Sequence, residues 1–355
     1  MKKIVDMKIA IIHYDLPRTN WHADMLQNVT YRYLRDINIY YNIIFRGEEL
    51  PDIKHTDLID ISEWCNPWHQ SIAQKYSIPI ICSTEEGSIT SLRNYLSINN
   101  INVQFMLSRI SHFIARSSFS KEMLTKFGID ENKISVLSYG IDLDVFKPSP
   151  ELDEPSSEPS EPSESEPSEP SFLYVPSFLY VGSINKQKGV HHLINAYLKI
   201  IEKTDWKLKL CIGEFNNDTE LLENIKTLSK KYDKIQLRPF PSTYQLPDIY
   251  QKSSCFCLIQ DKDSPVQFSY PSLWALSCGL PIISLNTGAL KDYVKNEENG
   301  FLCNEINQLP EKMLEITRID LNKMRKISRM IVENDHSPQK LAIKYKNICN
   351  KVGKI

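Results

Sequence analysis

The chain has 355 residues, of which 41% are hydrophobic and 24% are charged, and its formal net charge at pH 7 is −2. This length allows two α/β domains, each with its own core, and the charge gives no support for nucleic-acid binding. No run approaches the ~20 apolar residues of a membrane-spanning helix, and the first apolar run is too short for a signal peptide. We expect a cytoplasmic protein with at most a peripheral membrane contact, whose translation starts at Met1 or at Met7.

The cysteines indicate a reducing compartment, because none of them forms a C-x-x-C pair and most lie in apolar, strand-like runs. They are Cys65, Cys82, Cys211, Cys255, Cys257, Cys278, Cys303 and Cys349. No His-x-x-x-His or similar ligand cluster occurs, so no metal site is expected. His191 and His192 open an amphipathic helix and are assigned to its surface.

Strand-like and helical segments alternate through the first part of the chain. The expected strands are 8–12, 38–45, 58–61, 78–83, 113–116 and 134–137, and the expected helices are 21–35, 67–75 and 117–127. Ser118 or Ser120 is the expected N-cap of the last helix. Alternation of this kind favours a parallel, doubly wound sheet, which we assign to a first domain at 1–148.

A low-complexity run of Pro, Ser and Glu follows at 151–170 and cannot bury apolar surface. We expect a disordered or extended linker at 149–176. Residues 151–171 carry eight carboxylates and no Lys or Arg, so the rest of the chain has a net charge of +6 against −2 for the whole. This surplus would suit a phosphate-bearing donor or an anionic membrane, but solvated lysine-rich faces explain it equally well.

The second half of the chain repeats the alternation of strands and helices. The sequence SFLYV occurs twice, and only the second copy, 177–181, continues into a glycine loop, so it is the expected first strand. The expected strands are 178–181, 207–213, 235–238, 255–259 and 280–285, and the helices are 189–203, 219–231, 244–252, 271–277, 291–295, 322–334 and 338–352. We assign a second doubly wound sheet to a domain at 177–334.

Three segments resemble motifs of the retaining GT-B glycosyltransferases, the group 1 family. Residues 264–303 follow the spacing of E-x-F-G, E-A-M-A-C-G, P-V-V, G-G-I-P-E and N-G; residues 178–189 resemble a strand with G-R-x-x-x-x-K-G; and 136–148 resemble the hinge V-x-P-N-G-V-D-x-x-x-F-x-P. The resemblance covers roughly the second half and the hinge, whereas the first 110 residues match in outline. It implies a GT-B fold, in which two doubly wound Rossmann-like domains face a cleft and a C-terminal helix, 335–355, crosses back to the first domain.

This resemblance implies transfer of a hexosyl-type sugar, with retention, from a nucleotide-diphosphate donor to an unknown glycan, lipid or protein acceptor. The setting would be glycan, glycolipid or polysaccharide synthesis, with the nucleotide sugar as co-substrate and no further cofactor. Lys188 matches the family's phosphate-binding Lys, at a strand-to-helix turn whose amides also attract anions. The alternative is a surface lysine near a helix start, and Lys186 could take its place. Ser183 stands where the family has Arg, a charge that Arg116 or Lys186 could replace.

Val266 and Trp274 stand at the two glutamates of the family's E-x7-E motif, so the polar groups that orient the donor are absent there. Gln267 or Asp263 could supply a displaced polar contact. Trp274 could stack on a ring of the donor, but we favour core filling. The other donor-side positions offer backbone amides or small side chains near the ligand and are Gly182, Gln267, Phe268, Ser269, Gly288 and Ala289; Asp292 replaces a family Glu.

Glu85 and Glu86 follow a strand end where the family often has a His facing the donor sugar. At most one of them faces the cleft, where it could contact the sugar or the acceptor hydroxyl. Helix capping or a solvated loop explains them equally well. Weaker candidates are His13, Glu63, Trp64 and Trp68, whose tryptophans are more typical of packing.

A catalytically silent GT-B homologue that acts as a binding or scaffold subunit is the main alternative, because Ser183, Val266 and Trp274 depart from the motif. A sugar-nucleotide epimerase is a third hypothesis, and the hinge and signature spacing argue against it. The sequence specifies neither the donor base nor the sugar nor the acceptor.

Overall fold

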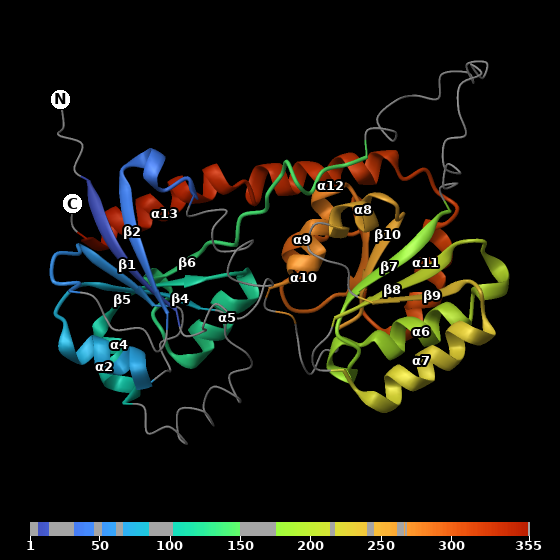
Figure 1. The fold of residues 1–355 in the computed structure, drawn as a ribbon, viewed down its shortest axis with the longest axis horizontal. Coiled ribbons are helices and arrows are strands. Elements are labelled where there is room, and N and C mark those ends of the chain that lie inside the picture. Colours follow the sequence, from blue (N-terminus) through green and yellow to red (C-terminus); the bar gives the residue numbers. More distant parts are fainter. Residues whose placement is uncertain are drawn as a thin grey trace, which may run out of the picture.

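Two parallel six-stranded sheets form the centre of the two domains (Figure 1). The structure is a computed structural model that describes residues 6–13, 32–45, 52–61, 67–84, 102–149, 175–213, 217–239, 245–260, 266 and 268–353. The expected linker at 149–176 and the expected helix at 21–35 lie largely outside these residues, as do Glu63, Trp64, Glu85, Glu86, Asp263 and Gln267.

The first sheet has the order β2-β1-β3-β4-β5-β6, and all its pairings are parallel. Its strands are β1 (Met7–His13), β2 (Ile39–Phe45), β3 (Leu58–Ile61), β4 (Ile80–Thr84), β5 (Ile110–Ala115) and β6 (Ile134–Val136). The described helices of this domain are α2 (Pro67–Lys75), α4 (Val103–Arg109) and α5 (Ser118–Phe127). The sequence did not predict α4, which is short. The cap expected at Ser118 or Ser120 was wrong: Ser117 is the N-cap of α5 and accepts a hydrogen bond from the Ser120 amide.

The second sheet has the order β12-β11-β10-β7-β8-β9, which is the 3-2-1-4-5-6 order of a Rossmann sheet read from β9. Its strands are β7 (Ser177–Gly182), β8 (Lys207–Ile212), β9 (Ile235–Pro239), β10 (Cys255–Leu258), β11 (Ile282–Leu285) and β12 (Gly300–Cys303). Its helices are α6 (Val190–Leu198), α7 (Thr219–Lys231), α8 (Leu246–Gln251), α9 (Tyr270–Ser277), α10 (Leu290–Tyr293) and α11 (Leu309–Ile316). The strand order reverses between β7 and β10, where sheets of this type bind ligands. The sequence did not predict β12 or α11, and the expected helix 189–203 ends earlier, at Leu198.

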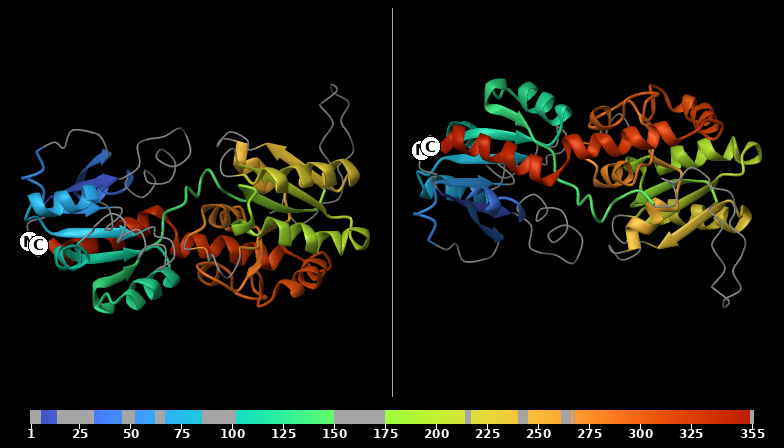
Figure 2. Two further views of the ribbon diagram at one scale, coloured as in Figure 1. Left: turned by 90° about the horizontal axis from the view of Figure 1, so that it is seen from below. Right: turned by 90° about the horizontal axis from the view of Figure 1, so that it is seen from above.

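Two further helices, α12 (Asn322–Asp335) and α13 (Pro338–Gly353), run along both domains (Figures 1 and 2). The inner face of α13 packs on the first sheet, where Leu341, Tyr345 and Cys349 share a core with strands β1 to β5. The Tyr345 hydroxyl donates to Oδ2 of Asp60 in β3, at 2.6 Å. The C-terminal helix therefore anchors the second domain to the first. Within the described part of the chain, no helix is long and apolar enough to cross a membrane.

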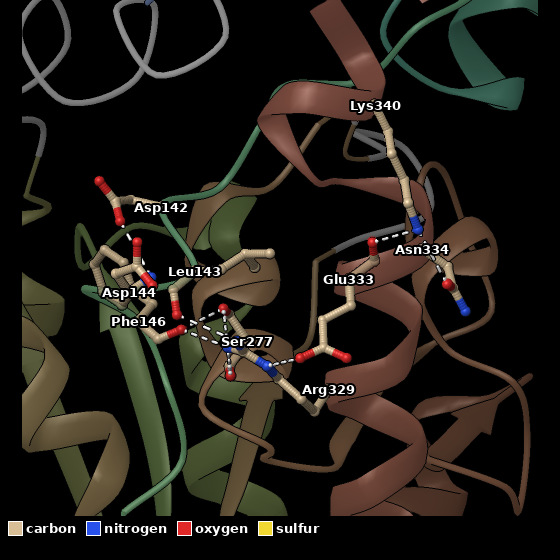
Figure 3. A network of polar contacts seen from close by, with 9 residues as sticks. All are labelled: Asp142, Leu143, Asp144, Phe146, Ser277, Arg329, Glu333, Asn334 and Lys340. Atoms are coloured by element: carbon tan, nitrogen blue, oxygen red, sulfur yellow. Dashed lines mark hydrogen bonds and ion pairs between the residues drawn. The ribbon is translucent and has the colours of Figure 1, made fainter. Parts of the chain in front are cut away.

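Arg329 of α12 fastens the segment that leaves the first domain (Figure 3). Its Nη1 donates to the carbonyl oxygens of Phe146 (2.8 Å) and Ser277 (2.9 Å), and its Nη2 donates to that of Leu143 (3.2 Å). Its Nε pairs with Glu333 at 2.7 Å, which orients the guanidinium. One side chain thus joins the hinge, α9 and α12.

Replacing Arg329 with alanine is expected to lower the free energy of unfolding by about 2–3 kcal/mol, because carbonyl groups of the hinge lose a charged donor. Arg329→Lys should recover little, since one ammonium cannot reproduce the planar fork of donors. Urea denaturation followed by circular dichroism measures both changes. Equal stability of Arg329→Ala and the unmodified chain would contradict this role, and Arg318→Ala, an exposed arginine of the same domain, is the control.

His336, between α12 and α13, makes the stability of the protein depend on pH. It is 5% exposed, and burial lowers the pKa of its imidazole from 6.5 to about 4. Between these two values the unfolded chain binds a proton that the folded chain rejects, so stability is lost as the pH falls from 6.5 towards 4. The loss should reach at most about 3 kcal/mol, and His336→Gln should reduce the slope of stability against pH. Denaturation midpoints at pH 7.5, 6 and 5 measure this, and parallel slopes for the two proteins would contradict it.

Candidate functional site

The carboxyl ends of the two sheets supply loops that meet at the domain boundary. Ser118, at the start of α5, donates its amide hydrogen to Oδ2 of Asp292 in α10, at 2.7 Å. The Ser118 hydroxyl also donates to Asp292. The pair joins residues 174 positions apart in the sequence, and Figure 1 shows α5 and α10 facing each other between the sheets. The residues expected to bind the donor lie mostly in the loops of the second domain on this side.

The loop from Gly182 to Gly189 follows β7 and holds Lys188 at the start of α6. Asn185 organises it: its Oδ1 accepts the amide hydrogen of Lys188 at 2.9 Å, and its Nδ2 donates to the Ser183 hydroxyl at 3.0 Å. Gly189 has a φ of +65°, and a Cβ there would stand 1.6 Å from the carbonyl oxygen of Ile259. The loop therefore needs glycine at its end, where it packs against the strand β10.

Lys188 combines partial burial with the absence of an ion-pair partner among the described residues. Its side chain is half-buried, and burial lowers the pKa of its amine below the usual value. None of the ion pairs among the described residues includes it. An anion placed beside the amine would favour the charged form. Lys186, the alternative in the same loop, is exposed.

The two predicted donor loops of the second domain touch through their backbones. The Ala289 amide donates to the carbonyl oxygen of Val266 at 2.6 Å. Gly288 has a φ of +55°, and a Cβ there would lie 2.2 Å from the same oxygen. The Val266 side chain is 4% exposed and belongs to the core of the domain, as does Ala289. These two positions can therefore offer a ligand little side-chain surface.

Trp274 fills the interior of the second domain. It is 2% exposed, and its ring stacks on Phe146 with centroids 5.0 Å apart and planes at 6°. Tyr250 and Tyr270 pack around it at 6.5 and 5.9 Å. This geometry favours the core-filling alternative over stacking on a donor ring.

Phe268 and Ser269 lie at the start of α9. Phe268 is half-buried, and Ser269 is the N-cap of the helix, with its hydroxyl accepting a hydrogen bond from the Ser272 amide at 3.2 Å. The Ser269 hydroxyl also contacts that of Ser272 at 2.7 Å. Since these bonds engage the Ser269 side chain in the helix start, its local role is capping.

Arg116 lies at the end of β5 in the first domain and is 7% exposed. Its guanidinium carbon stands 4.0 Å from the centre of the Tyr139 ring. Ser183, whose missing charge it was expected to replace, belongs to the second domain. The described contacts of Arg116 are with Leu137 and Tyr139 of the first domain. That Arg116 replaces the positive charge absent at Ser183 stays a prediction.

The remaining candidate residues are undescribed or pack within the first domain. Glu85, Glu86 and Gln267 lie outside the described residues, and the side chain of His13 is also undescribed. Trp68, on α2, packs against the core of the first sheet. No group of three or more His, Cys, Asp or Glu side chains is arranged to hold a metal among the described residues. All seven cysteines in the described ranges are free and buried.

Sequence reasoning missed two contacts that connect the domains, Ser118 with Asp292 and Tyr139 with Phe268. Asp292 was noted only as a replacement for a family Glu. No local pattern links Ser118 to it, because the pair arises from the packing of two separate domains. Tyr139 stands at the Asn of the hinge motif, and this departure was the one signal available.

Comparison with known proteins adds family information for the second half of the chain. Residues 164–330 match the family model described as Glycosyl transferases group 1. An uncharacterized glycosyltransferase of Haemophilus influenzae is 28% identical over 179 residues, which cover 48% of this chain and 48% of that protein. Spore coat protein SA of Bacillus subtilis is 27% identical over 177 residues, covering 46% of each. The chain thus spans about half the length of these curated relatives.

Solved structures resemble the chain over nearly its whole length. A glycosyltransferase from Rickettsia africae has a TM-score of 0.69 at 18% identity, covering 98% of each chain. Sucrose-phosphate synthase from Thermosynechococcus elongatus has a TM-score of 0.70 at 16% identity, covering 97% of this chain and 98% of that one. HepE from Anabaena in complex with UDP-glucose has a TM-score of 0.67 at 14% identity, covering 98% and 100%. The expected two-domain GT-B fold is confirmed, and residues 164–330 match the group 1 glycosyl transferases.

Proposed function

We propose that this protein is a glycosyltransferase that moves a sugar from a nucleotide-diphosphate donor to a glycan, lipid or protein acceptor with retention. The observation that carries the proposal is Lys188, an amine with a lowered pKa, presented by an ordered loop at the strand-order reversal of a Rossmann sheet. The match of residues 164–330 to the group 1 glycosyl transferases supports it. The HepE structure contains UDP-glucose, which makes UDP-sugars the first donors to test.

In the proposed reaction, the bond between the anomeric carbon and the diphosphate oxygen breaks as the acceptor oxygen bonds to the same carbon from the same face, which retains the configuration. The O–H bond of the acceptor breaks, its electron pair stays on the acceptor oxygen, and the departing diphosphate accepts the proton. Negative charge grows on the diphosphate, and Lys188 would stabilise it there. Backbone amides near Phe268 and Gly288 would hold the donor, and Glu85 or Glu86 would contact the sugar or the acceptor. We assign no metal ion or further cofactor to this reaction.

A silent homologue that binds partners remains the second candidate, because Val266 and Trp274 are buried where the family motif has glutamates. A nucleotide site would still be expected in a silent binder of donors, whereas a scaffold subunit needs none. Nucleotide binding therefore separates a scaffold subunit from a transferase, and turnover separates a transferase from a silent binder of donors.

Thermal denaturation in the presence of UDP, GDP, ADP, CDP and their common sugar conjugates tests the proposal. A ligand at one hundred times its Kd should stabilise the folded protein by about 2.7 kcal/mol, which shifts the midpoint by several degrees. A shift with one nucleotide supports a donor site and identifies the base. No shift with any of them, from protein shown to be folded, would overturn the proposal and favour a scaffold subunit. Release of free nucleotide with added acceptors then separates a transferase from a silent binder.

A further inference from the structure

The turn between β5 and α5, residues 116–117, and the first residue of α5, Ser118, link the first domain to both predicted donor segments of the second domain. Ser118 bonds Asp292, which follows the Gly288–Ala289 loop by three residues. Arg116 contacts Tyr139, whose ring packs against Phe268 and Tyr270 at the start of α9. This short segment of the first domain therefore reaches the Gly288–Ala289 side of the candidate site directly, and the start of α9 through Tyr139.

Arg116 is an unusual buried arginine, because it makes few hydrogen bonds. Its Nη1 donates to the Leu137 carbonyl oxygen at 3.2 Å, and its Nε has no hydrogen-bond partner among the described residues. A guanidinium has five N–H donors, and buried donors are ordinarily satisfied. Its guanidinium carbon also lies over the face of the Tyr139 ring, 4.0 Å from the ring centre, an attraction that strengthens when water is excluded.

Asp60 is a buried carboxyl that interacts electrostatically with Arg116. Its carboxylate is 1% exposed and accepts hydrogen bonds from the Tyr345 hydroxyl at 2.6 Å and the Ser83 hydroxyl at 2.9 Å. Burial raises the pKa of this carboxyl, while the bond from Tyr345 and the charge of Arg116 act in the opposite direction. Asp60 therefore adds an electrostatic attraction to the two contacts that hold the guanidinium, the Leu137 carbonyl oxygen and the Tyr139 ring.

The Tyr139 ring contacts two aromatic rings of the second domain. It meets Phe268 edge-on, with centroids 4.8 Å apart and planes at 75°, and it stacks on Tyr270 at 5.3 Å and 30°. Phe268 and Tyr270 also contact each other at 4.5 Å. Since Ser269, the N-cap of α9, stands between Phe268 and Tyr270 in the sequence, the Tyr139 ring packs against the segment that begins this helix.

We propose that Arg116 is a positioning residue for the donor site: it fixes the Tyr139 ring and thereby holds residues 268–270 against the first domain. Arg116 does not touch the donor in this account. It acts through Tyr139, and the bonds from Ser118 to Asp292 hold the neighbouring loop in the same way. The inference rests on the proposed function, since these loops matter for binding only if they hold a donor nucleotide.

The experiment compares Arg116→Met, Arg116→Lys, Tyr139→Leu and the double variant Arg116→Met/Tyr139→Leu. The Kd of the nucleotide found in the thermal screen is measured by calorimetry, and small-angle X-ray scattering measures the radius of gyration without ligand. Arg116→Met should weaken binding at least fivefold and enlarge the radius, and Arg116→Lys should recover part of both. The double variant should bind no more weakly than the worse single variant, because both changes interrupt the same path.

Arg109→Met is the matched control. Arg109 donates to the carbonyl oxygens of Ala73, Tyr76 and Ile78 inside the first domain, so its loss should lower the melting temperature but leave the Kd and the radius unchanged. If the unmodified protein binds no nucleotide, the proposed function fails, while the scattering comparison still tests the contact between domains. If the protein binds nucleotide and Arg116→Met has the same Kd and radius, the inference is overturned and the proposed function stands. If Arg116→Met does not fold, Tyr139→Leu tests the same path.

Discussion

Gly189→Ala is expected to destabilise the second domain by more than about 4 kcal/mol and to abolish nucleotide binding. A methyl group at this position would stand 1.6 Å from the Ile259 carbonyl oxygen, so the backbone of the loop or of the residue that follows β10 must shift. The φ of +65° adds conformational strain of about 1–2 kcal/mol. Lys188 precedes this glycine, and therefore any shift displaces its amine.

Gly128→Ala separates the clash from the strain. Gly128 ends α5 with a φ of +106°, but a Cβ there would meet no heavy atom within 4 Å. Gly128→Ala should lower the free energy of unfolding only by the conformational strain of the positive φ, and the variant should keep its nucleotide affinity. Urea denaturation of both variants measures the difference, and equal losses of stability at the two glycines would contradict the packing described for the loop.

Trp274→Ala is expected to lower the free energy of unfolding by about 3–5 kcal/mol, because it leaves a cavity among three aromatic rings. The ring stacks on Phe146 from the hinge, and Tyr250 and Tyr270 pack around it. Trp274→Phe should retain most of this packing, at a smaller cost. Denaturation curves measure the stability of both variants.

Trp274→Glu distinguishes packing from donor recognition at the same position. This change places a carboxylate where the family motif has one, yet at a site that is 2% exposed. Because a buried charge without a partner is strongly unfavourable, we expect it to destabilise the protein at least as much as Trp274→Ala. Tighter nucleotide binding by a folded Trp274→Glu variant would contradict the assignment of this tryptophan to the core.

The fold followed from local patterns because most strands are continuous apolar runs and most helices have clear periods. Helices 67–75 and 219–231 and strand 58–61 were predicted with the bounds that the structure gives. β12 was missed because GFLC has only four residues and starts with glycine. No element was assigned at α11, which carries Pro310 in its first turn, where proline is well tolerated.

The sequence could predict only those parts of the candidate site that come from a single loop. The resemblance of residues 178–189 to the family motif pointed to Lys188, and the structure adds the Asn185 cap and the close approach of Gly189 to Ile259. Contacts that cross the domain boundary depend on the packing of distant segments. The burial of Trp274 could be favoured from residue type alone, but its partner Phe146 lies 128 positions away, in the hinge.

The central claim is that the amine of Lys188 binds the diphosphate of the donor. Calorimetric titration of the nucleotide from the thermal screen into the unmodified protein, Lys188→Ala and Lys199→Ala measures it directly. Lys199 is an exposed lysine that caps the other end of the same helix, α6. The account predicts that Lys188→Ala raises the Kd by about 10- to 150-fold, the loss of one charge-assisted contact, while Lys199→Ala leaves it unchanged. Equal affinity of Lys188→Ala and the unmodified protein would contradict it.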